Sequence, residues 1–268
     1  MARPTLLAGD MGGTKTLLAL YDLEGETLIK RHQQRFVSAD WSSLEPMLKA
    51  FVEERPKDVQ APTHGCIAVA GPVRNRQARI TNLPWQLKEE DLAAAARMQQ
   101  LELVNDFGVL IYGLPHFGAD QQVVLQEGSQ DDGPLAILGA GTGLGMARGV
   151  RTSNGLMALS SEGGHREFAP RSDEEWQLAC WLKQDLGVDR LSIERVVSGT
   201  GLGHIAHWLL LQPGAQSHPL RSVAEAWRRN VASDLPAHVS LAAEEGDPLM
   251  RHACLLYTSD AADEIVRV

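Results

Sequence analysis

Residues 5–22, TLLAGDMGGTKTLLALYD, decide the fold class of this 268-residue chain. An apolar run leads into the pair Gly12–Gly13 and a second apolar run follows, which predicts two strands joined by a glycine turn. Residues 134–150, PLAILGAGTGLGMARGV, repeat the pattern. The repetition indicates two domains built on a common plan, with glycine turns that face each other.

Strand-like and helix-like segments alternate along the rest of the chain. Residues 87–99 predict a helix, and residues 101–106 predict a buried strand that leads directly into a helix over residues 107–114. The Ser-x-x-Glu spacing at residues 42–45 and 172–175 predicts capping boxes at the starts of two further helices. This alternation is typical of an α/β protein.

The composition excludes several classes of protein. The chain carries 25 Lys and Arg residues against 34 Asp and Glu residues, a formal net charge of −9, without a basic stripe, so we expect no nucleic-acid partner. The longest apolar runs are too short to cross a membrane, and the N-terminus leaves no room for a signal peptide. Cys66, Cys180 and Cys254 are widely scattered, which argues against a disulfide framework or a clustered metal site. We expect a cytoplasmic protein that does not bind membranes.

Three glycine runs, at residues 9–15, 139–145 and 198–203, could each be a tight turn. Together they indicate phosphate binding, because glycine lets backbone amides approach an anion closely. A Walker loop is excluded because Gly-Lys never occurs, and a dinucleotide-binding turn because residues 139–145 precede a strand-like segment. The Asp-Phe-Gly at residues 106–108 does not indicate a protein kinase, because the chain has no His-Arg-Asp.

Six motifs, taken in order, resemble those of bacterial glucokinases, which belong to the hexokinase/actin-like ATPase superfamily. They are DMGGTKTLLAL (10–20), ITNLPW (80–85), LVNDF (103–107), GAGTGLG (139–145), EGGH (162–165) and ERVVSGTGL (194–202). The resemblance implies two actin-like ATPase (ribonuclease H-like) α/β domains, with mixed sheets flanked by helices and a cleft for sugar and ATP between the domains. We place the smaller domain at residues 1–107 and the larger at residues 108–268.

The implied reaction is the ATP-dependent phosphorylation of glucose at its 6-hydroxyl, which yields glucose 6-phosphate and ADP. This transfer needs a base for the attacking hydroxyl, and Asp106, at the carboxyl end of a predicted strand, is the candidate. The alternative is that Asp106 only caps the helix that follows. The sugar-binding residues that the resemblance implies are Asn82, Asn105, Asp106, Glu162, His165 and Glu194. Taken singly, Glu194 could be an ordinary helix residue and His165 an ordinary core histidine.

The resemblance also implies an ATP site, with Mg²⁺ as the ion that accompanies the nucleotide. The residues expected at the phosphates are Gly9, Asp10, Met11, Gly12, Gly13, Thr14, Lys15, Gly141, Thr142 and Gly143. Asp10 would orient a hydrated Mg²⁺, which takes few protein ligands and retains waters. Most bacterial glucokinases carry asparagine where Lys15 stands, and Lys15 would either add a charge for phosphate or face solvent.

Two departures from the family pattern leave alternatives open. Lysine at the position of Lys15 is common in the repressor/kinase (ROK) group, which includes kinases of other hexoses. Kinases of that group usually bind zinc through cysteines that follow the Gly-His pair. Here no cysteine follows His165 before Cys180, so we do not expect a zinc site. Residues 254–268, CLLYTSDAADEIVRV, do not match the family, so we expect an incomplete second domain, impaired ATP binding and a homodimer that covers an exposed edge. The corresponding alternative function is a non-catalytic sugar-binding remnant.

Overall fold

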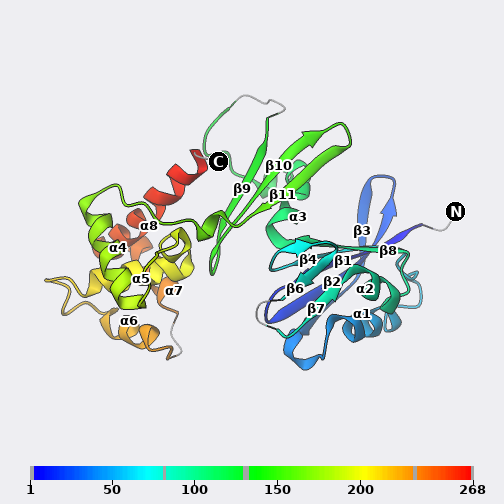
Figure 1. Ribbon diagram of the computed structural model, residues 1–268, viewed down its shortest axis with the longest axis horizontal. Helices are drawn as coiled ribbons and strands as arrows, with labels where there is room; N and C mark the ends of the chain where they lie inside the picture. The colour runs from blue at the N-terminus through cyan, green and yellow to red at the C-terminus, as the bar shows by residue number, and fades with distance from the viewer. Residues whose placement is uncertain (1–2, 81–82, 129–132, 232–233, 267–268) are drawn as a thin grey trace. The chain divides into compact units, whose positions relative to one another are not determined.

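The computed structural model describes residues 3–80, 83–128, 133–231 and 234–266 (Figure 1). The backbone divides into two compact units: Met1–Asp131 with Thr152–Ser160, and Asp132–Arg151 with Ser161–Val268. Each unit buries its own cluster of apolar side chains. The domain boundary expected between residues 107 and 108 stays a prediction.

A five-stranded mixed sheet of order β3-β2-β1-β4-β8 forms the centre of the first unit. Its strands are β1 (Thr5–Met11), β2 (Lys15–Glu24), β3 (Thr27–Val37), β4 (His64–Val69) and β8 (Gln100–Asn105). The first three strands form an antiparallel meander, whereas β4 and β8 run parallel to β1. The carboxyl ends of β1, β4 and β8 therefore lie at the same end of the sheet.

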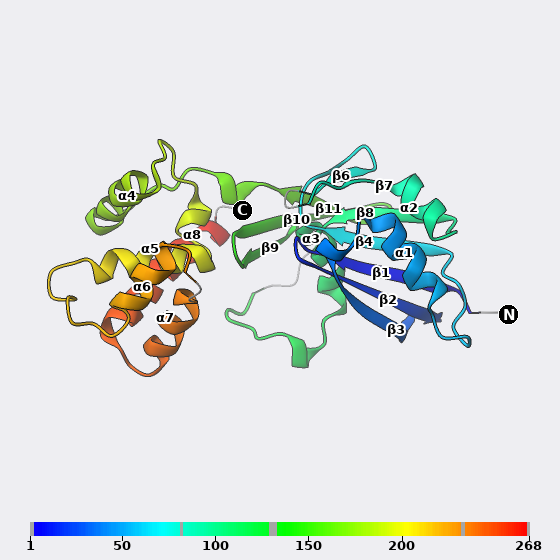
Figure 2. The same cartoon turned by 90° about the horizontal axis from the view of Figure 1, so that it is seen from below.

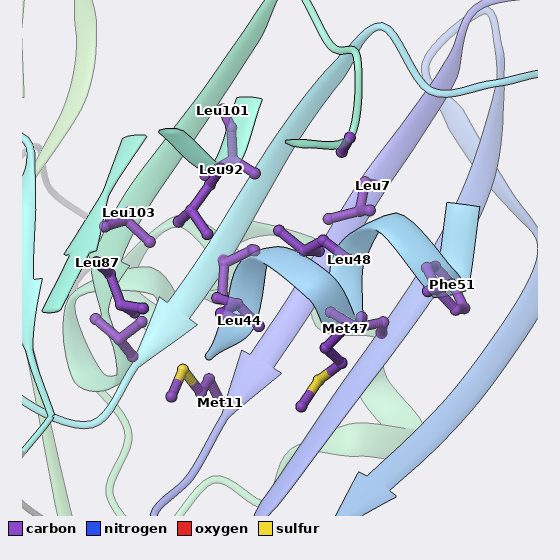
Figure 3. Close-up of a cluster of buried hydrophobic side chains, with 14 of the residues drawn as sticks. Leu7, Met11, Leu44, Met47, Leu48, Phe51, Leu87, Leu92, Leu101 and Leu103 are labelled. Carbon is purple, nitrogen blue, oxygen red and sulfur yellow. The ribbon is translucent and has the colours of Figure 1, made fainter. Parts of the chain in front are cut away.

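Helices α1 (Leu44–Glu53) and α2 (Glu89–Ala95) pack apolar side chains against this sheet (Figure 3). Met47, Leu48 and Phe51 of α1 are fully buried among the strands. They recur at spacings of one to four residues and so occupy one face of the helix. Burial of this face joins α1 to the sheet and builds the core of the unit.

One helix boundary and one capping box differ from the predictions, and a second capping box is confirmed in part. The helix expected over residues 87–99 ends at Ala95, because Arg97 adopts a left-handed φ of 55° and the chain turns into β8. The N-cap of α1 is Ser43, without a side-chain cap, so the capping box predicted at residues 42–45 is wrong. Half of the capping box predicted at residues 172–175 is confirmed, since Ser172 Oγ accepts a hydrogen bond from the Glu175 amide at 3.1 Å. The Glu175 carboxylate accepts from the Arg171 amide at 2.6 Å instead of from the Ser172 amide.

β8 is an edge strand, and a buried carboxylate binds one of its amides. Glu89, the first residue of α2, accepts a hydrogen bond from Leu103 N at 3.0 Å and pairs with Arg76 Nε at 2.7 Å. Arg76 lies in the turn of a small three-stranded sheet. The strands of that sheet are β5 (Val73–Arg74), β6 (Gln77–Arg79) and β7 (Gln86–Lys88). Glu89 thus joins the small sheet to the edge of the large one.

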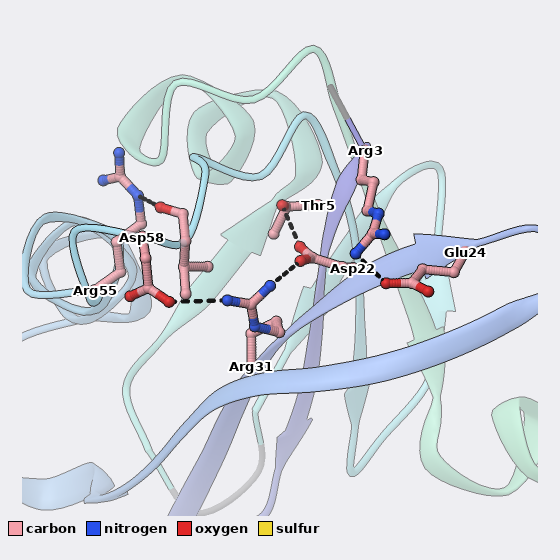
Figure 4. Close-up of polar contacts among 8 residues, drawn as sticks. Arg3, Thr5, Asp22, Glu24, Arg31, Arg55 and Asp58 are labelled. Atoms are coloured by element: carbon pink, nitrogen blue, oxygen red, sulfur yellow. Dashed lines mark hydrogen bonds and ion pairs between the residues drawn. The ribbon is translucent and has the colours of Figure 1, made fainter. Parts of the chain in front are cut away.

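A polar cluster holds the meander together at β2 and β3 (Figure 4). Asp22 in β2 is buried, accepts a hydrogen bond from Thr5 Oγ1 at 2.8 Å and pairs with Arg31 in β3. The same guanidinium reaches Asp58 at 2.9 Å. Because a buried carboxylate is costly unless it is hydrogen-bonded and paired, these contacts fix the position of Asp22.

The second unit is mainly helical and is arranged around α5 (Gly199–Leu210) (Figure 2). The helices that contact α5 are α4 (Asp173–Leu186), α6 (Arg221–Arg228), α7 (Leu235–Glu244) and α8 (Pro248–Val266). Residues 201–210 of α5 are all buried, as expected for a helix enclosed by others. Across the described ranges, no helix combines the length and the apolar character needed to cross a membrane.

A second strand–turn–strand pattern is present in β9 (Leu135–Ala140) and β10 (Leu144–Thr152), which pair antiparallel. β11 (Gly155–Ser161) follows β10 in a sheet of order β11-β10-β9. The strand–turn–strand units predicted at residues 5–22 and 134–150 are therefore both confirmed. α3 (Asp106–Gly113) follows β8 directly, as predicted for that segment.

Candidate active site

The first glycine turn joins β1 to β2. The Gly12 amide donates to the Lys15 carbonyl at 2.9 Å, and the Thr14 carbonyl accepts from the Ser38 amide at 3.0 Å. These bonds fix a tight turn in which Asp10, Thr14 and Lys15 are exposed. The turn thus presents a carboxylate, a hydroxyl and an ammonium group to solvent.

Gly9 and Met11 of the same motif have roles inside the unit. A Cβ added to Gly9 would lie 2.9 Å from Ile67 Cγ1, so glycine permits close packing between β1 and β4. The Met11 side chain is 1% exposed, and its carbonyl accepts a hydrogen bond from the Ala70 amide at 3.2 Å. Among the residues expected at the phosphates, these two therefore offer no side chain to a ligand.

Asp106 lies at the same end of the sheet as this turn. The strand register aligns Met11, Val69 and Asn105 at the carboxyl ends of β1, β4 and β8. Adjacent strands are about 4.8 Å apart, so two strand spacings, about 10 Å, separate the end of β1 from the end of β8. The carboxyl ends of parallel strands are where open α/β sheets bind ligands.

Asn105, and not Asp106, caps α3. Its Oδ1 accepts hydrogen bonds from the amides of Phe107 (3.2 Å) and Gly108 (3.0 Å). Its Nδ2 donates to the Gly71 carbonyl at 3.1 Å and to Asp106 Oδ1 at 2.9 Å. The capping role considered for Asp106 is therefore taken by its neighbour, which also orients the Asp106 carboxylate.

Asp106 is half-buried and carries its hydrogen bonds on one oxygen. Oδ1 accepts from Asn105 Nδ2 and from the Phe107 amide at 3.0 Å. Burial raises the pKa of Asp106 above its usual value, the hydrogen bonds from Phe107 and Asn105 lower it in part, and the charge of Asp10 raises it further. A carboxylate whose pKa is raised in this way is a stronger base than an exposed one, which suits general-base chemistry.

In the second unit, an imidazole lies between two carboxylates. Glu162 precedes η4 (Gly163–His165), and Glu194 lies in η5 (Ile193–Arg195). His165 Nε2 is 3.5 Å from Glu162 Oε2, and His165 Nδ1 is 3.2 Å from Glu194 Oε1. The side chains of Glu162 and His165 are mostly exposed, so the cluster offers acceptors and an imidazole to a polyhydroxy ligand.

Backbone contacts hold this cluster in place. The Arg190 guanidinium donates to the His165 carbonyl at 2.7 Å, and the Ile193 amide donates to the Arg166 carbonyl at 2.8 Å. Gly164 is buried so closely that an added Cβ would lie 2.2 Å from the Leu144 carbonyl oxygen. The glycines of the EGGH motif therefore let η4 approach β10, which brings His165 to Glu194.

The second glycine turn, residues 141–143, adjoins the same cluster. The Gly141 amide donates to the Gly143 carbonyl at 2.9 Å and closes the turn between β9 and β10. A Cβ added to Gly143 would lie 2.9 Å from Glu194 Oε2, so a larger residue there would displace the carboxylate. A candidate phosphate turn and a candidate sugar ligand are thus neighbours within one unit.

Three serine and threonine contacts in this unit were not predicted from the sequence. Ser192 Oγ donates to Glu194 Oε1 at 3.5 Å, and Ser198 Oγ donates to the Glu194 carbonyl at 2.6 Å. Thr200 Oγ1 donates to the Thr142 carbonyl at 3.0 Å. Ser198 also caps α5, which its place before a glycine-rich helix start could have indicated. The contact between Thr200 and Thr142 joins residues 58 apart in the sequence and has no local signal.

The structure therefore gathers the expected residues into two clusters, one in each unit. The first cluster contains residues 9–15, Asn105 and Asp106, and the second contains residues 141–143, Glu162, His165 and Glu194. Asn82 lies outside the described residues. Each cluster combines a glycine turn with side chains that can bind or deprotonate a hydroxyl.

The first cluster is compatible with Mg²⁺ but not with a metal held by protein ligands alone. Within the described ranges, no group of three or more His, Cys, Asp or Glu residues could hold a metal ion. Mg²⁺ usually keeps several waters and takes one or two carboxylates together with substrate phosphates. A single exposed carboxylate such as Asp10, beside a glycine turn, fits that requirement.

Comparisons with known proteins give a consistent result. The family model described as Glucokinase matches residues 7–263. A curated glucokinase from Synechocystis sp. is 38% identical over 260 residues, which cover 91% of this chain and 73% of that protein. One from Nostoc sp. is 36% identical over 269 residues, which cover 96% of this chain and 77% of that protein.

A solved structure of a glucokinase has a fold similar to that of this chain. The crystal structure of a glucokinase from an Antarctic psychrotroph is similar with a TM-score of 0.77 and 29% sequence identity. The match covers 99% of this chain and 80% of that chain. The predicted fold class, α/β with mixed sheets flanked by helices, is therefore confirmed.

Proposed function

Because this chain belongs to the glucokinase family, we propose that it transfers the terminal phosphoryl group of ATP to the 6-hydroxyl of glucose, with Asp106 as the base. The matches do not favour the two alternatives, a ROK-like kinase of another hexose and a non-catalytic sugar-binding remnant. A single observation supports the assignment of the base: Asp106 stands at the carboxyl ends of the parallel strands, beside a glycine turn, with a raised pKa.

In the proposed reaction, Asp106 accepts the proton of the 6-hydroxyl while the sugar oxygen attacks the terminal phosphorus. The new O–P bond forms as the bond between that phosphorus and the bridging oxygen breaks, and ADP leaves. Asn105 contributes by holding Asp106 Oδ1, which leaves Oδ2 without a hydrogen bond from any other described residue. That oxygen is the one we assign to the substrate proton.

We assign the sugar ring to Glu162, His165 and Glu194, with Asn82 and Asn105 as further candidates. Vicinal hydroxyls can donate to the two carboxylates, and the imidazole of His165 can complete the set. The separations of 3.2 and 3.5 Å support this assignment, because three side chains so close together can contact one small ligand. His165 and Glu194 therefore do not act as a core histidine and an isolated helix residue in this proposal.

We assign the phosphates to the two glycine turns, residues 12–14 and 141–143. Backbone amides in such turns bind phosphate oxygens. Asp10 would hold hydrated Mg²⁺, which when bound neutralises charge on the phosphates. Lys15 is exposed, so a charge contact with phosphate is open to it. The cytoplasmic location and the homodimer expected from the sequence remain predictions.

The test of the base is the Asp106→Asn variant, assayed for glucose phosphorylation by a coupled-enzyme assay. Asparagine retains an acceptor for the Asn105 and Phe107 donors, so the local structure should persist. General-base catalysis contributes about a hundred- to ten-thousand-fold, so turnover should fall by at least about a hundred-fold. Glucose binding, measured by calorimetry, should change by less than about three-fold, because Glu162, His165 and Glu194 are intact and asparagine at position 106 can still accept from a sugar hydroxyl.

Asp173→Asn is the matched control. Asp173 is the first residue of α4, as Asp106 is of α3, but it is exposed and lies outside both clusters. Its replacement should leave turnover unchanged. Turnover by Asp106→Asn within about ten-fold of wild type would disprove the role of Asp106. Loss of turnover at full glucose affinity in Asp10→Asn, and not in Asp106→Asn, would transfer the role of base to Asp10.

A further inference from the structure

Every carbonyl of the second glycine turn is engaged in a hydrogen bond. The Gly141 carbonyl accepts from the Gly199 amide at 2.7 Å, and the Gly143 carbonyl accepts from the Gly141 amide at 2.9 Å. The Thr142 carbonyl accepts from Thr200 Oγ1 at 3.0 Å. By contrast, the amides of Thr142 and Gly143 donate to no acceptor in the described part of the chain. The turn therefore has its acceptors satisfied and its donors available.

A turn with satisfied carbonyls and available amides favours an anionic ligand. A phosphate oxygen is attracted by amide hydrogens and repelled by carbonyl oxygens, because both the ligand and the carbonyl are acceptors. A peptide plane carries its carbonyl and the next amide in opposite directions. Holding the Thr142 carbonyl on one side thus points the Gly143 amide to the other side.

Of the three hydrogen bonds that the turn carbonyls accept, the one from Thr200 comes from a side chain. It is the second residue of α5, behind the N-cap Ser198, whose Oγ accepts from the Gly201 amide at 2.9 Å. The cap fixes the start of the helix and so fixes Thr200. We infer that Thr200 is a positioning residue for the phosphate turn: its hydroxyl orients the peptide between Thr142 and Gly143 so that the Gly143 amide faces the nucleotide. This inference rests on the proposed function, which assigns the turn to ATP.

Sugar binding should depend little on this bond. Glu194 approaches the turn at Gly143, where an added Cβ would lie 2.9 Å from Oε2, and makes no hydrogen bond with Thr200 in the described structure. The Glu194 carboxylate is held by His165 and Ser192 instead. Loss of the Thr200 hydroxyl should therefore affect the nucleotide more than the sugar.

The experiment compares Thr200→Val, Thr200→Ser and wild type. One hydrogen bond between neutral groups corresponds to about a three- to ten-fold change in an equilibrium constant. Thr200→Val should therefore weaken binding of a non-hydrolysable ATP analogue with Mg²⁺ about three- to ten-fold in calorimetry, and raise KM for ATP equally. KM for glucose should change less than about two-fold, and Thr200→Ser should restore nucleotide affinity because it keeps the hydroxyl.

Thr152→Val is the matched control, because Thr152 Oγ1 also donates to a turn carbonyl, that of Gly155, at 2.8 Å. It lies at the opposite end of β10 from residues 141–143. Its replacement should leave nucleotide affinity unchanged. Wild-type nucleotide affinity in Thr200→Val, equal losses in Thr152→Val, or no rescue by serine would each overturn the inference.

The two proposals can fail separately. If wild type binds the ATP analogue but does not phosphorylate glucose, the proposed reaction is wrong, and calorimetry on the Thr200 variants still decides the role of Thr200. If wild type phosphorylates glucose and Thr200→Val binds nucleotide normally, only the positioning role is wrong. Failure of wild type to bind the nucleotide at all would overturn both.

Discussion

His204 should make the second unit sensitive to acid. The residue lies in α5, is 5% exposed and packs edge-on against Trp227 at a centroid distance of 5.2 Å. Neither of its ring nitrogens has a hydrogen-bond partner in the described structure. A buried imidazole without a partner favours its neutral form, because the charged form would lose its hydration.

The charged groups around His204 do not cancel its preference for the neutral form. The pKa of His204 is lowered from 6.5 to about 4, mainly by burial and further by the charges of Arg195 and Arg228. Asp185 acts in the opposite direction but pairs with Arg228 at 2.8 Å, which limits its influence. Burial lowers the pKa of His207, one turn further along α5, in the same way.

The sign and size of the pH effect follow from these values. Because the folded pKa lies below the unfolded one, the unfolded chain takes up the proton first as the pH falls. Stability from neutral His204 is therefore complete above about pH 6.5, declines as the pH falls towards about 4, and is lost below that. Between about pH 7 and about pH 5 the loss is about 2 kcal/mol for this one residue.

The assay is urea denaturation at both pH values, followed by tryptophan fluorescence. His204→Phe keeps a ring against Trp227 but cannot titrate, so it should lose about 2 kcal/mol less than wild type on acidification. His116→Phe, at an exposed histidine, should behave as wild type. If His204→Phe loses as much stability between the two pH values as wild type does, the reasoning is refuted.

Two further substitutions test the turn and the core. Gly164→Ala should weaken glucose binding more than about ten-fold in a fluorescence titration, because an added Cβ would meet the Leu144 carbonyl oxygen at 2.2 Å and push η4 from Glu194. Gly128→Ala, in open space, should have no effect, and equal affinity in both variants would contradict the packing argument. Phe51→Ala should lower the free energy of unfolding by about 3–5 kcal/mol in urea denaturation, because Phe51 is fully buried. A loss below about 1 kcal/mol would mean that the first unit repacks around the gap.

The sequence predicted those features that short-range patterns determine. Both strand–turn–strand units follow from apolar runs broken by glycine, and the direct passage from β8 into α3 follows from the strand-like and helix-like patterns of residues 101–114. The cap at Ser172 was also predictable, because its partner is three residues away. In each of these cases the partners are close in sequence or share one periodicity.

Features that depend on distant partners were not predictable. Asn105 caps α3 because its amide is held by the Gly71 carbonyl, 34 residues earlier, which leaves Asp106 free of that task. Thr200 meets Thr142 only after β9, β10 and α5 have packed. The positions of Glu162, His165 and Glu194 as a cluster followed from family resemblance, since no local rule relates residues 162–165 to residue 194.

The contact between Glu89 and the last strand of the large sheet has a consequence for self-association. A strand from another molecule that paired with the edge strand β8 would need the Leu103 amide as a hydrogen-bond donor. That donor is already bound to Oε1 of Glu89, so a pairing strand would have to break this hydrogen bond and leave one oxygen of a buried carboxylate without its donor. Glu89, a side chain outside both clusters, thereby disfavours the pairing of a further strand with this edge of the sheet.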